Sequence, residues 1–247
     1  MIEKLAGVNS IMEAIKGRRK VHKIFIQDGR QNKRIEELLE LASKKGIFIQ
    51  KVDKERLNQM YRVGNHQGIV AQVDSYDYAT IEEVLEEVVL KGQEPLLVIL
   101  DGLEDPQNLG SIIRTAECAG VHGIIIPRHN SVEITEGVAR ASAGAVEHMH
   151  IIRETNLVNT INYLKKQGFW IIGADMEGTS DYFATKLPSP TVIVIGGEGK
   201  GIKRLVKENC DILVKIPMYG NINSLNASVA ATLLIYEVVR QRRFNDK

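Results

Sequence analysis

Short runs of continuously apolar, mostly β-branched residues recur along the second half of the chain and alternate with segments of helical periodicity. Such runs are typical of strands buried on both faces. Strand alternating with helix favours a parallel sheet covered by helices. The predicted strands are "LLVILD", "GIIIP", "FWIIGA", "TVIVIG" and "ILVKIP", starting at residues 96, 123, 169, 191 and 212, and the predicted helices span 108–120, 133–144, 155–168, 201–209 and 229–239.

The first seventy or so residues show the same alternation on a smaller scale. Asn9 or Ser10 is the expected cap of the first helix. An acidic helix follows this unit, and Thr80 with Glu83 forms a capping-box pattern at its start. We therefore expect a small α/β domain at 1–74, an acidic linker at 75–95 and a larger α/β domain at 96–247. Within the small domain the predicted helices span 7–17, 34–46 and 53–61, and the strands span 22–27, 47–52 and 68–73.

Composition is that of an ordinary globular protein, with 44% hydrophobic and 26% charged residues. No apolar run reaches the length of a membrane span, and the start "MIEKLAGVNS" does not have the pattern of a signal peptide. Cys118 and Cys210 lie far apart in the sequence, without metal-like spacing, which favours a reducing compartment. These features predict a cytoplasmic protein.

The net charge of +1 conceals an uneven distribution. Residues 1–73 hold fifteen Lys/Arg against eight Asp/Glu, residues 74–95 hold one against seven, and the remainder is balanced. The densest basic cluster is "GRRKVHK", residues 17–23. A solvated helix end explains that cluster alone, whereas the asymmetry of the whole segment is typical of a module that meets a polyanion.

Two predicted strands are followed by segments with candidate chemistry, and in parallel sheets ligands bind beyond the carboxyl ends of strands. After the first strand comes "GLEDPQNLGSIIRTA", where Asn108 is placed to cap the next helix and Arg114 to reach back toward the same loop. After the fourth comes "GEGKGI", whose alternate glycines around Glu198 and Lys200 suggest close approach of backbone to a ligand. Neither a Walker A loop nor a dinucleotide fingerprint is present. Capping, a surface arginine and a simple glycine turn are the structural alternatives.

A third segment, "YGNINSLNAS" at 219–228, follows the last predicted strand. One of its short polar side chains suffices to cap the helix that follows, so the others are in excess of structural need. That helix is apolar nearly all round, which predicts burial, partly against another subunit.

Together, "DPQNLGSIIRTA", "GGEGKGI" and "IPMYGNINSLNASVAATLLIYE" resemble the three motifs of the SpoU-type (TrmH-like) RNA 2′-O-ribose methyltransferases of the SPOUT superfamily. "GVNSIMEAI" and "NHQGIVAQV" resemble the substrate-binding domain of the bacterial two-domain enzymes that modify a guanosine of 23S ribosomal RNA. The resemblance implies a parallel-sheet domain with a deep trefoil knot, preceded by a small α/β RNA-binding domain of a type known from ribosomal proteins. It also implies a homodimer packed through the C-terminal helix, without a metal.

The same resemblance implies S-adenosylmethionine as cofactor. Its main-chain contacts would be Gly196, Ile216, Leu225 and Ala174. The catalytic residues implied are Arg114, Asn108, Glu198, Ser224 and Asn226.

The family assigns proton handling to the arginine, here Arg114. A guanidinium stays protonated to a pKa above about 12, so we expect Arg114 to hold the target phosphate and ribose and to lower the pKa of the hydroxyl. Asn108 would bond substrate or fix Arg114, and Glu198 would pair with Arg114 or orient its loop. Phosphate contacts in the small domain are expected from Arg18, Arg19, Lys20 and Lys23.

Alternatives remain open at this stage. The same chemistry on transfer RNA is one, and a non-catalytic RNA-binding or ribosome-assembly protein on this fold is another. A dehydrogenase is remote because the dinucleotide fingerprint is missing. His148 and His150 have no third ligand nearby in the sequence, and His66 is expected in a tight turn or at an RNA contact.

Overall fold

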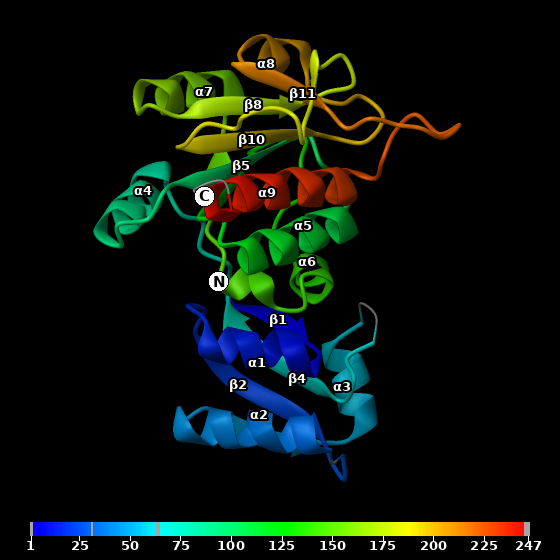
Figure 1. The fold of residues 1–247 in the computed structure, drawn as a ribbon. Helices are drawn as coiled ribbons and strands as arrows, with labels where there is room; N and C mark the ends of the chain where they lie inside the picture. The colour runs from blue at the N-terminus through cyan, green and yellow to red at the C-terminus, as the bar shows by residue number, and fades with distance from the viewer. Residues whose placement is uncertain (1, 31, 63–64, 245–247) are drawn as a thin grey trace. The chain divides into compact units, whose positions relative to one another are not determined.

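The computed structural model describes residues 2–30, 32–62 and 65–244. Contacts divide the chain into two compact units (Figure 1). The first comprises the residues up to Asp77 together with Ile134–His148, and the second comprises Tyr78–Glu133 and the residues from Met149 onwards. Residues 134–148, which the sequence places within 96–247, therefore pack with the N-terminal residues.

The first unit is built on a four-stranded sheet of order β1-β4-β2-β3. Strands β1 and β2 each pair antiparallel with β4, and β3 runs parallel to β2 at the edge. Strand β1 was not predicted, because Glu3 and Lys4 interrupt its apolar pattern. The elements are β1 Ile2–Ala6, α1 Val8–Lys16, β2 Val21–Gln27, α2 Lys33–Lys44, β3 Phe48–Val52, α3 Lys54–Met60, β4 Ile69–Asp74, α6 Glu136–Ala141 and the 3₁₀ turn η1 Ala145–Glu147.

The predicted cap of α1 is wrong. The N-cap is Gly7, with φ of 90° and no side-chain cap, and both Asn9 and Ser10 lie inside the helix. Ser10 is buried and its Oγ donates to the carbonyl of Ala139 over 3.4 Å, while Oδ1 of Asn9 accepts from Nε of Arg34 over 3.1 Å. Both side chains are thus engaged in tertiary contacts.

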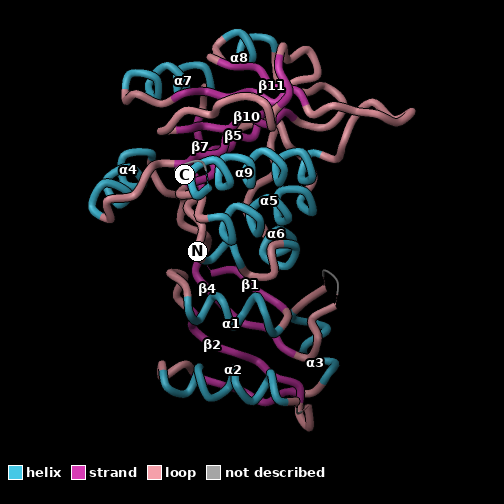
Figure 2. Tube along the Cα trace, in the orientation of Figure 1, coloured by secondary structure: helices cyan, strands magenta, loops and turns pink. Residues whose placement is uncertain are grey.

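The second unit contains the predicted parallel sheet, with seven strands in the order β7-β6-β5-β10-β8-β11-β9. Its strands are magenta in Figure 2. Every neighbouring pair is parallel. The five predicted strands are confirmed as β5 Leu96–Asp101, β6 Gly123–Pro127, β8 Trp170–Ala174, β10 Thr191–Gly196 and β11 Ile212–Lys215. Two further strands, β7 Ile151–Glu154 and β9 Ser180–Asp181, are short edge strands whose pattern was too brief to predict.

Helices α4, α7 and α8 cover one face of this sheet, and α5 and α9 pack against each other within the same unit (Figure 1). The acidic segment 75–95 is more than a connector, because Ile81, Val84 and Val88 of α4 belong to the core. The Thr80–Glu83 capping box is confirmed. Among the described residues no helix is long and apolar enough to cross a membrane. The helices are α4 Ile81–Leu90, α5 Pro106–Ala119, α7 Leu157–Lys166, α8 Arg204–Glu208 and α9 Ala227–Phe244.

Candidate functional site

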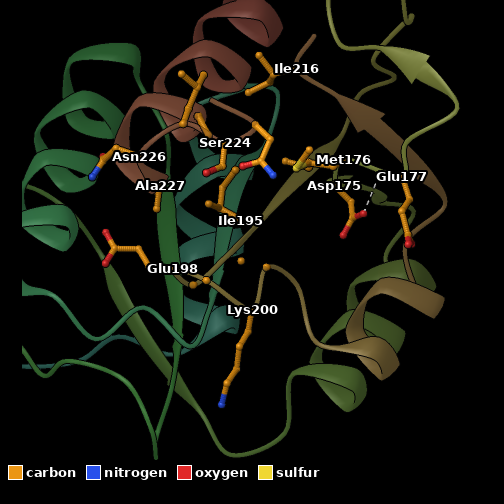
Figure 3. A pocket seen from close by; sticks show the side chains of 18 of the residues that line it. Asp175, Met176, Glu177, Ile195, Glu198, Lys200, Ile216, Ser224, Asn226 and Ala227 are labelled. Atoms are coloured by element: carbon orange, nitrogen blue, oxygen red, sulfur yellow. Dashed lines mark hydrogen bonds between the residues drawn. The ribbon is translucent and has the colours of Figure 1, made fainter. Parts of the chain in front are cut away.

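A cavity of about 670 Å³ lies in the second unit, beyond the carboxyl ends of β8, β10 and β11 (Figure 3). Segments that follow three different strands form its wall, as expected for a ligand site at the end of a parallel sheet. Ala174, Gly196, Ile216 and Leu225, the residues expected to contact a cofactor, all line it. The complete lining is 174–177, 195–201 and 223–227 with Lys207, Ile216, Met218 and Ala230.

The glycine loop at this cavity requires its glycines for close backbone approach. A Cβ on Gly196 would lie 2.0 Å from the carbonyl carbon of Gly201, and one on Gly197 would lie 2.3 Å from the carbonyl oxygen of Gly102. Gly199 and Gly201 have φ of 78° and 63°, which side chains disfavour. The loop therefore folds back tightly over the end of β5.

Asp101, the last residue of β5, anchors both ends of this loop. Its carbonyl accepts from Gly197 N over 2.9 Å. Its carboxylate accepts from the backbone N of Lys203 over 2.8 Å and from Nζ of Lys203 over 3.0 Å. The carboxylate side chain is 1% exposed. Sequence reasoning missed this residue, although a carboxylate ending a buried strand is a usable signal.

A chain of hydrogen bonds joins the three predicted motifs. Asn108 Nδ2 donates to Oε1 of Glu198 in the glycine loop. Oδ1 of Asn108 accepts from Nδ2 of Asn226 over 2.9 Å. Oδ1 of Asn226 in turn accepts from the backbone N and the Oγ of Ser228, over 2.9 and 2.6 Å. Asn226 thus caps α9 with its oxygen and uses its nitrogen to hold the motifs together.

The expected capping role of Asn108 is wrong. Asp105 is the N-cap of α5, accepting from the backbone N of Gln107 over 3.1 Å and of Asn108 over 3.2 Å. Asn108 lies within the first turn and is buried, with 6% of its surface exposed. The aspartate cap leaves the Asn108 amide available to Glu198 and Asn226.

Arg114 and Ser224 are both exposed. Ser224 lines the cavity and points into it (Figure 3). Arg114 lies on α5, outside the cavity lining, and the structure pairs Glu198 with Asn108 instead of with Arg114. The guanidinium is therefore at the surface.

The wall after β8 carries charged groups that sequence reasoning did not single out. Nζ of Lys207 lies 2.6 Å from Oε2 of Glu177 and 3.4 Å from Oδ2 of Asp175. The hydrogen bond to Glu177 raises the pKa of Lys207 above its ordinary value. With two carboxylates against one ammonium, this side of the cavity carries a net negative charge.

The histidines have separate carboxylate partners. Nε2 of His148 lies 2.8 Å from Oε2 of Glu13, and Nε2 of His150 lies 2.8 Å from Oε2 of Glu87. His66 is buried in a turn, where its Nδ1 accepts from the backbone N of Gly68 over 2.9 Å. Burial lowers the pKa of His66 below its ordinary value.

The predicted basic cluster of the first unit separates into a buried and a surface part. The side chain of Arg19 is 5% exposed, lies 3.2 Å from Oε1 of the buried Glu147 and stacks over Tyr76. Phosphates cannot reach a side chain buried in this way, so the prediction of Arg19 as an RNA contact is wrong. Arg18 and Lys20 are exposed, and Lys23 is partly exposed on β2.

Comparison with known proteins decides the family. The model of the SpoU rRNA methylase family matches residues 95–236, and that of the RNA 2′-O ribose methyltransferase substrate-binding domain matches residues 4–79. The chain belongs to the SpoU rRNA methylase family. It is an RNA methyltransferase of that family, and the predicted resemblance is confirmed.

Two relatives of this SpoU family member cover nearly its whole length. YacO of Bacillus subtilis, assigned to the TrmH family of tRNA/rRNA methyltransferases, is 46% identical over 96% of this chain and 94% of its own. The SpoU methyltransferase AviRb of Streptomyces viridochromogenes, crystallised with AdoMet, superposes with a TM-score of 0.81 at 26% identity, over 98% of this chain and 90% of its own. A TrmH/SpoU tRNA modifying enzyme of A. aeolicus matches 66% of this chain and 86% of its own, at 29% identity and a TM-score of 0.56.

Proposed function

We propose that the chain transfers a methyl group from S-adenosylmethionine to the ribose 2′-hydroxyl of a guanosine in 23S ribosomal RNA. The observation that carries this proposal is the joining of the three motifs. Asn108, Glu198 and Asn226 are bonded to one another beside a cavity that all four expected cofactor residues line.

The residues around the cavity fit this cofactor. Met176, Ile195, Met218 and Leu225 offer apolar surface to an adenine ring and a thioether chain. The net negative wall of Asp175, Glu177 and Lys207 suits a ligand with sulfonium and ammonium charges. The four glycines of the loop line the cavity with main-chain atoms alone, so a ligand can approach the backbone there closely. When bound, S-adenosylmethionine supplies an electrophilic methyl group.

The chain then has to position the ribose and remove one proton. Asn108, Glu198 and Asn226 fix the glycine loop and the start of α9 relative to α5, so the cavity wall is held before substrate arrives. Ser224 presents its hydroxyl to the cavity (Figure 3).

The exposed guanidinium of Arg114 is free to take up the phosphate and ribose of the target nucleotide. Its charge lowers the pKa of the 2′-hydroxyl, and the proton leaves to the phosphate or to water. Arg114 therefore acts as an electrostatic positioner in this proposal.

A homodimer packed through α9 is part of the proposal. The large side chains of Val229 and Tyr236 on α9 are 45% and 46% exposed, and they offer surface for packing against a second copy of the chain. A trefoil knot, with the C-terminal segment threaded through a loop, is likewise proposed from the family resemblance. We propose the first unit as the substrate-binding domain and the second unit, with α4 in its core, as the methyltransferase domain. We propose a cytoplasmic location together with the ribosomal RNA substrate.

Transfer RNA is the second candidate substrate, since relatives are named for both tRNA and rRNA. Ribosomal and transfer RNA from a deletion strain, incubated with the protein and methyl-labelled S-adenosylmethionine, separates the two. We expect label in 23S RNA and a 2′-O-methylguanosine located by mass spectrometry. Failure of the protein to bind S-adenosylmethionine by calorimetry would refute the methyltransferase proposal, and label confined to tRNA would change its substrate.

A further inference from the structure

The sheet of the first unit is covered unequally on its two faces. One face carries Leu5, Ile24, Ala71 and Val73, all at most 1% exposed, so the centre of this face is buried. On the opposite face an apolar cluster forms against α3, where Leu57 and Tyr61 meet Phe25 and Val70. Helix α3 is only seven residues long, so it shields one end of that face.

The other end of the same face presents a row of side chains across all four strands. Strand register pairs Lys4 with Gln72, Gln72 with Lys23, and Lys23 with Phe48. Register partners point to the same side of a sheet, so the four form one continuous surface. Lys4 and Phe48 are exposed, and Gln72 and Lys23 are partly exposed.

An aromatic ring dominates this row. Phe48 is 62% exposed on the edge strand β3, an unusual position for a phenyl ring. Nζ of Lys23 lies 4.9 Å from the centroid of Phe48 and 4.9 Å from that of Phe25. The Lys23 ammonium thus lies beside the Phe48 ring, and most of the Phe48 side chain remains exposed to solvent.

Charge on this surface favours a polyanion. Among the strand residues of this face the single carboxylate is Asp74, and its Oδ1 lies 2.7 Å from Nε2 of His22. The lysines Lys4 and Lys23 carry no such acidic partner within the described residues; Nζ of Lys4 donates to the carbonyl of Met60 over 2.7 Å. An exposed ring beside the Lys23 ammonium, with a second lysine further along the same face, suits single-stranded nucleic acid: the ring is a stacking surface for a base, and the cations can meet phosphates.

We propose that the row Lys4–Gln72–Lys23–Phe48 binds a single-stranded segment of the RNA substrate, with one base stacked on Phe48 and a phosphate at Lys23. The proposal rests on RNA being the substrate and adds where the first unit holds it. Gln72 supplies hydrogen-bonding groups between the two lysines.

The test measures binding of the full-length protein to a short fluorescein-labelled single-stranded RNA and to the same sequence as a duplex. Phe48→Ala is expected to weaken single-strand binding about tenfold because it removes the stacking surface, and Phe48→Trp is expected to retain binding because an indole ring also stacks on a base. Lys23→Met is expected to reduce the slope of log affinity against log salt by about 0.7, as for one lost phosphate contact on a single strand.

Two controls keep the result specific. Lys51→Met removes an exposed charge from the alternate face of β3, and Leu90→Ala removes an exposed apolar side chain from the second unit; both are expected to bind like the wild type. Unchanged single-strand affinity in Phe48→Ala with an unchanged melting temperature, or equal loss in Phe48→Trp, would overturn the proposal. Cofactor binding is measured in parallel, so a failed methyltransferase function is recognised separately.

Discussion

Nδ2 of Asn226 donates a hydrogen bond to Oδ1 of Asn108 over 2.9 Å, although 118 positions separate the two residues in the sequence. The same Asn226 caps α9 through its oxygen. One side chain therefore serves both a local structural need and the assembly of the site. Substitution can separate these two roles.

Asn226→Asp is expected to keep the cap and break the link. An aspartate oxygen still accepts from Ser228, but the second oxygen faces the acceptor oxygen of Asn108. We expect near wild-type thermal stability and loss of methyl transfer. Asn226→Ala removes the cap as well and should destabilise by about 1 kcal/mol. Equal activity of Asn226→Asp and wild type would show that the bond to Asn108 is dispensable.

Arg114→Ala is expected to lower methyl transfer at least about a hundredfold by removing the charge that positions the nucleotide. Because Arg114 lies outside the cavity lining, S-adenosylmethionine affinity by calorimetry should stay within about twofold of wild type. Lys166→Met, which removes an exposed cation from α7, is the control and should transfer methyl like the wild type. Full activity of Arg114→Ala would contradict its assigned role.

Asp101→Asn is expected to loosen the glycine loop. The amide replaces one of the two oxygens that accept from the backbone N and Nζ of Lys203. Because this loop lines the cavity, S-adenosylmethionine should bind about tenfold more weakly, a loss typical of a hydrogen bond to a charged group. Lys203→Met keeps the hydrogen bond from the backbone N of residue 203 to the Asp101 carboxylate. This variant should therefore bind S-adenosylmethionine more tightly than Asp101→Asn does. Equal S-adenosylmethionine affinity of Asp101→Asn and the wild type in calorimetry would show that Asp101 is not needed to hold the loop.

The two cysteines should differ in reactivity. Burial raises the pKa of the Cys210 thiol to about 12, and its Sγ lies 3.4 Å from the carbonyl of Val206. Cys118 is exposed on α5. Since the thiolate is the reactive form, a disulfide reagent should label one thiol in the native protein and two after denaturation. Rapid labelling of both thiols in the native protein would contradict the expected low reactivity of the partly buried Cys210.

Acid should weaken the attachment of α4 through Glu87. Hydrogen bonds from Lys91 at 2.5 Å and His150 at 2.8 Å lower the pKa of Glu87 to about 2. A carboxylate with a depressed folded pKa stabilises the fold above its unfolded pKa, about 4.5, and this contribution disappears as the pH falls toward 2.

Glu87→Gln should therefore lose about 0.5–1 kcal/mol at neutral pH, a modest value for a pair that is partly solvent-exposed. Its melting temperature should also fall less steeply than that of the wild type as the pH is lowered from about 4.5 to 2. The neighbouring Glu86→Gln is the control, because the exposed Glu86 carboxylate has no ion-pair partner within the described residues. Parallel acid profiles in wild type and Glu87→Gln would contradict the prediction.

Local patterns were sufficient for much of the fold. The β-branched runs gave the five central strands, and the Thr80–Glu83 pattern gave a capping box, because both are set by neighbours in the sequence. Local patterns gave wrong predictions where a side chain bonds to a residue far away in the sequence. Asn9 and Ser10 had the chemistry of a cap, yet their side chains bond to Arg34 and Ala139. Asn108 is not the cap of α5 for a local reason, because Asp105 three positions earlier already caps that helix.

The basic cluster shows the same limit for a functional surface. Sequence placed Arg18, Arg19, Lys20 and Lys23 together because they are close along the chain. The structure buries Arg19 against Glu147 and sets Lys23 beside Phe48 on another strand. Charge composition predicts that a module meets a polyanion, whereas strand register decides which side chains share a face.

The sequence by itself determined the family, the parallel sheet and the residue types of the site, because motifs and hydrophobic periodicity are properties of short segments. Only the tertiary structure decided that Asp101 clamps the glycine loop, that Glu198 pairs with Asn108, and that Asn226 both caps α9 and joins the motifs. These contacts link side chains roughly a hundred positions apart. Their geometry follows from the order of strands in the sheet, which no local pattern encodes.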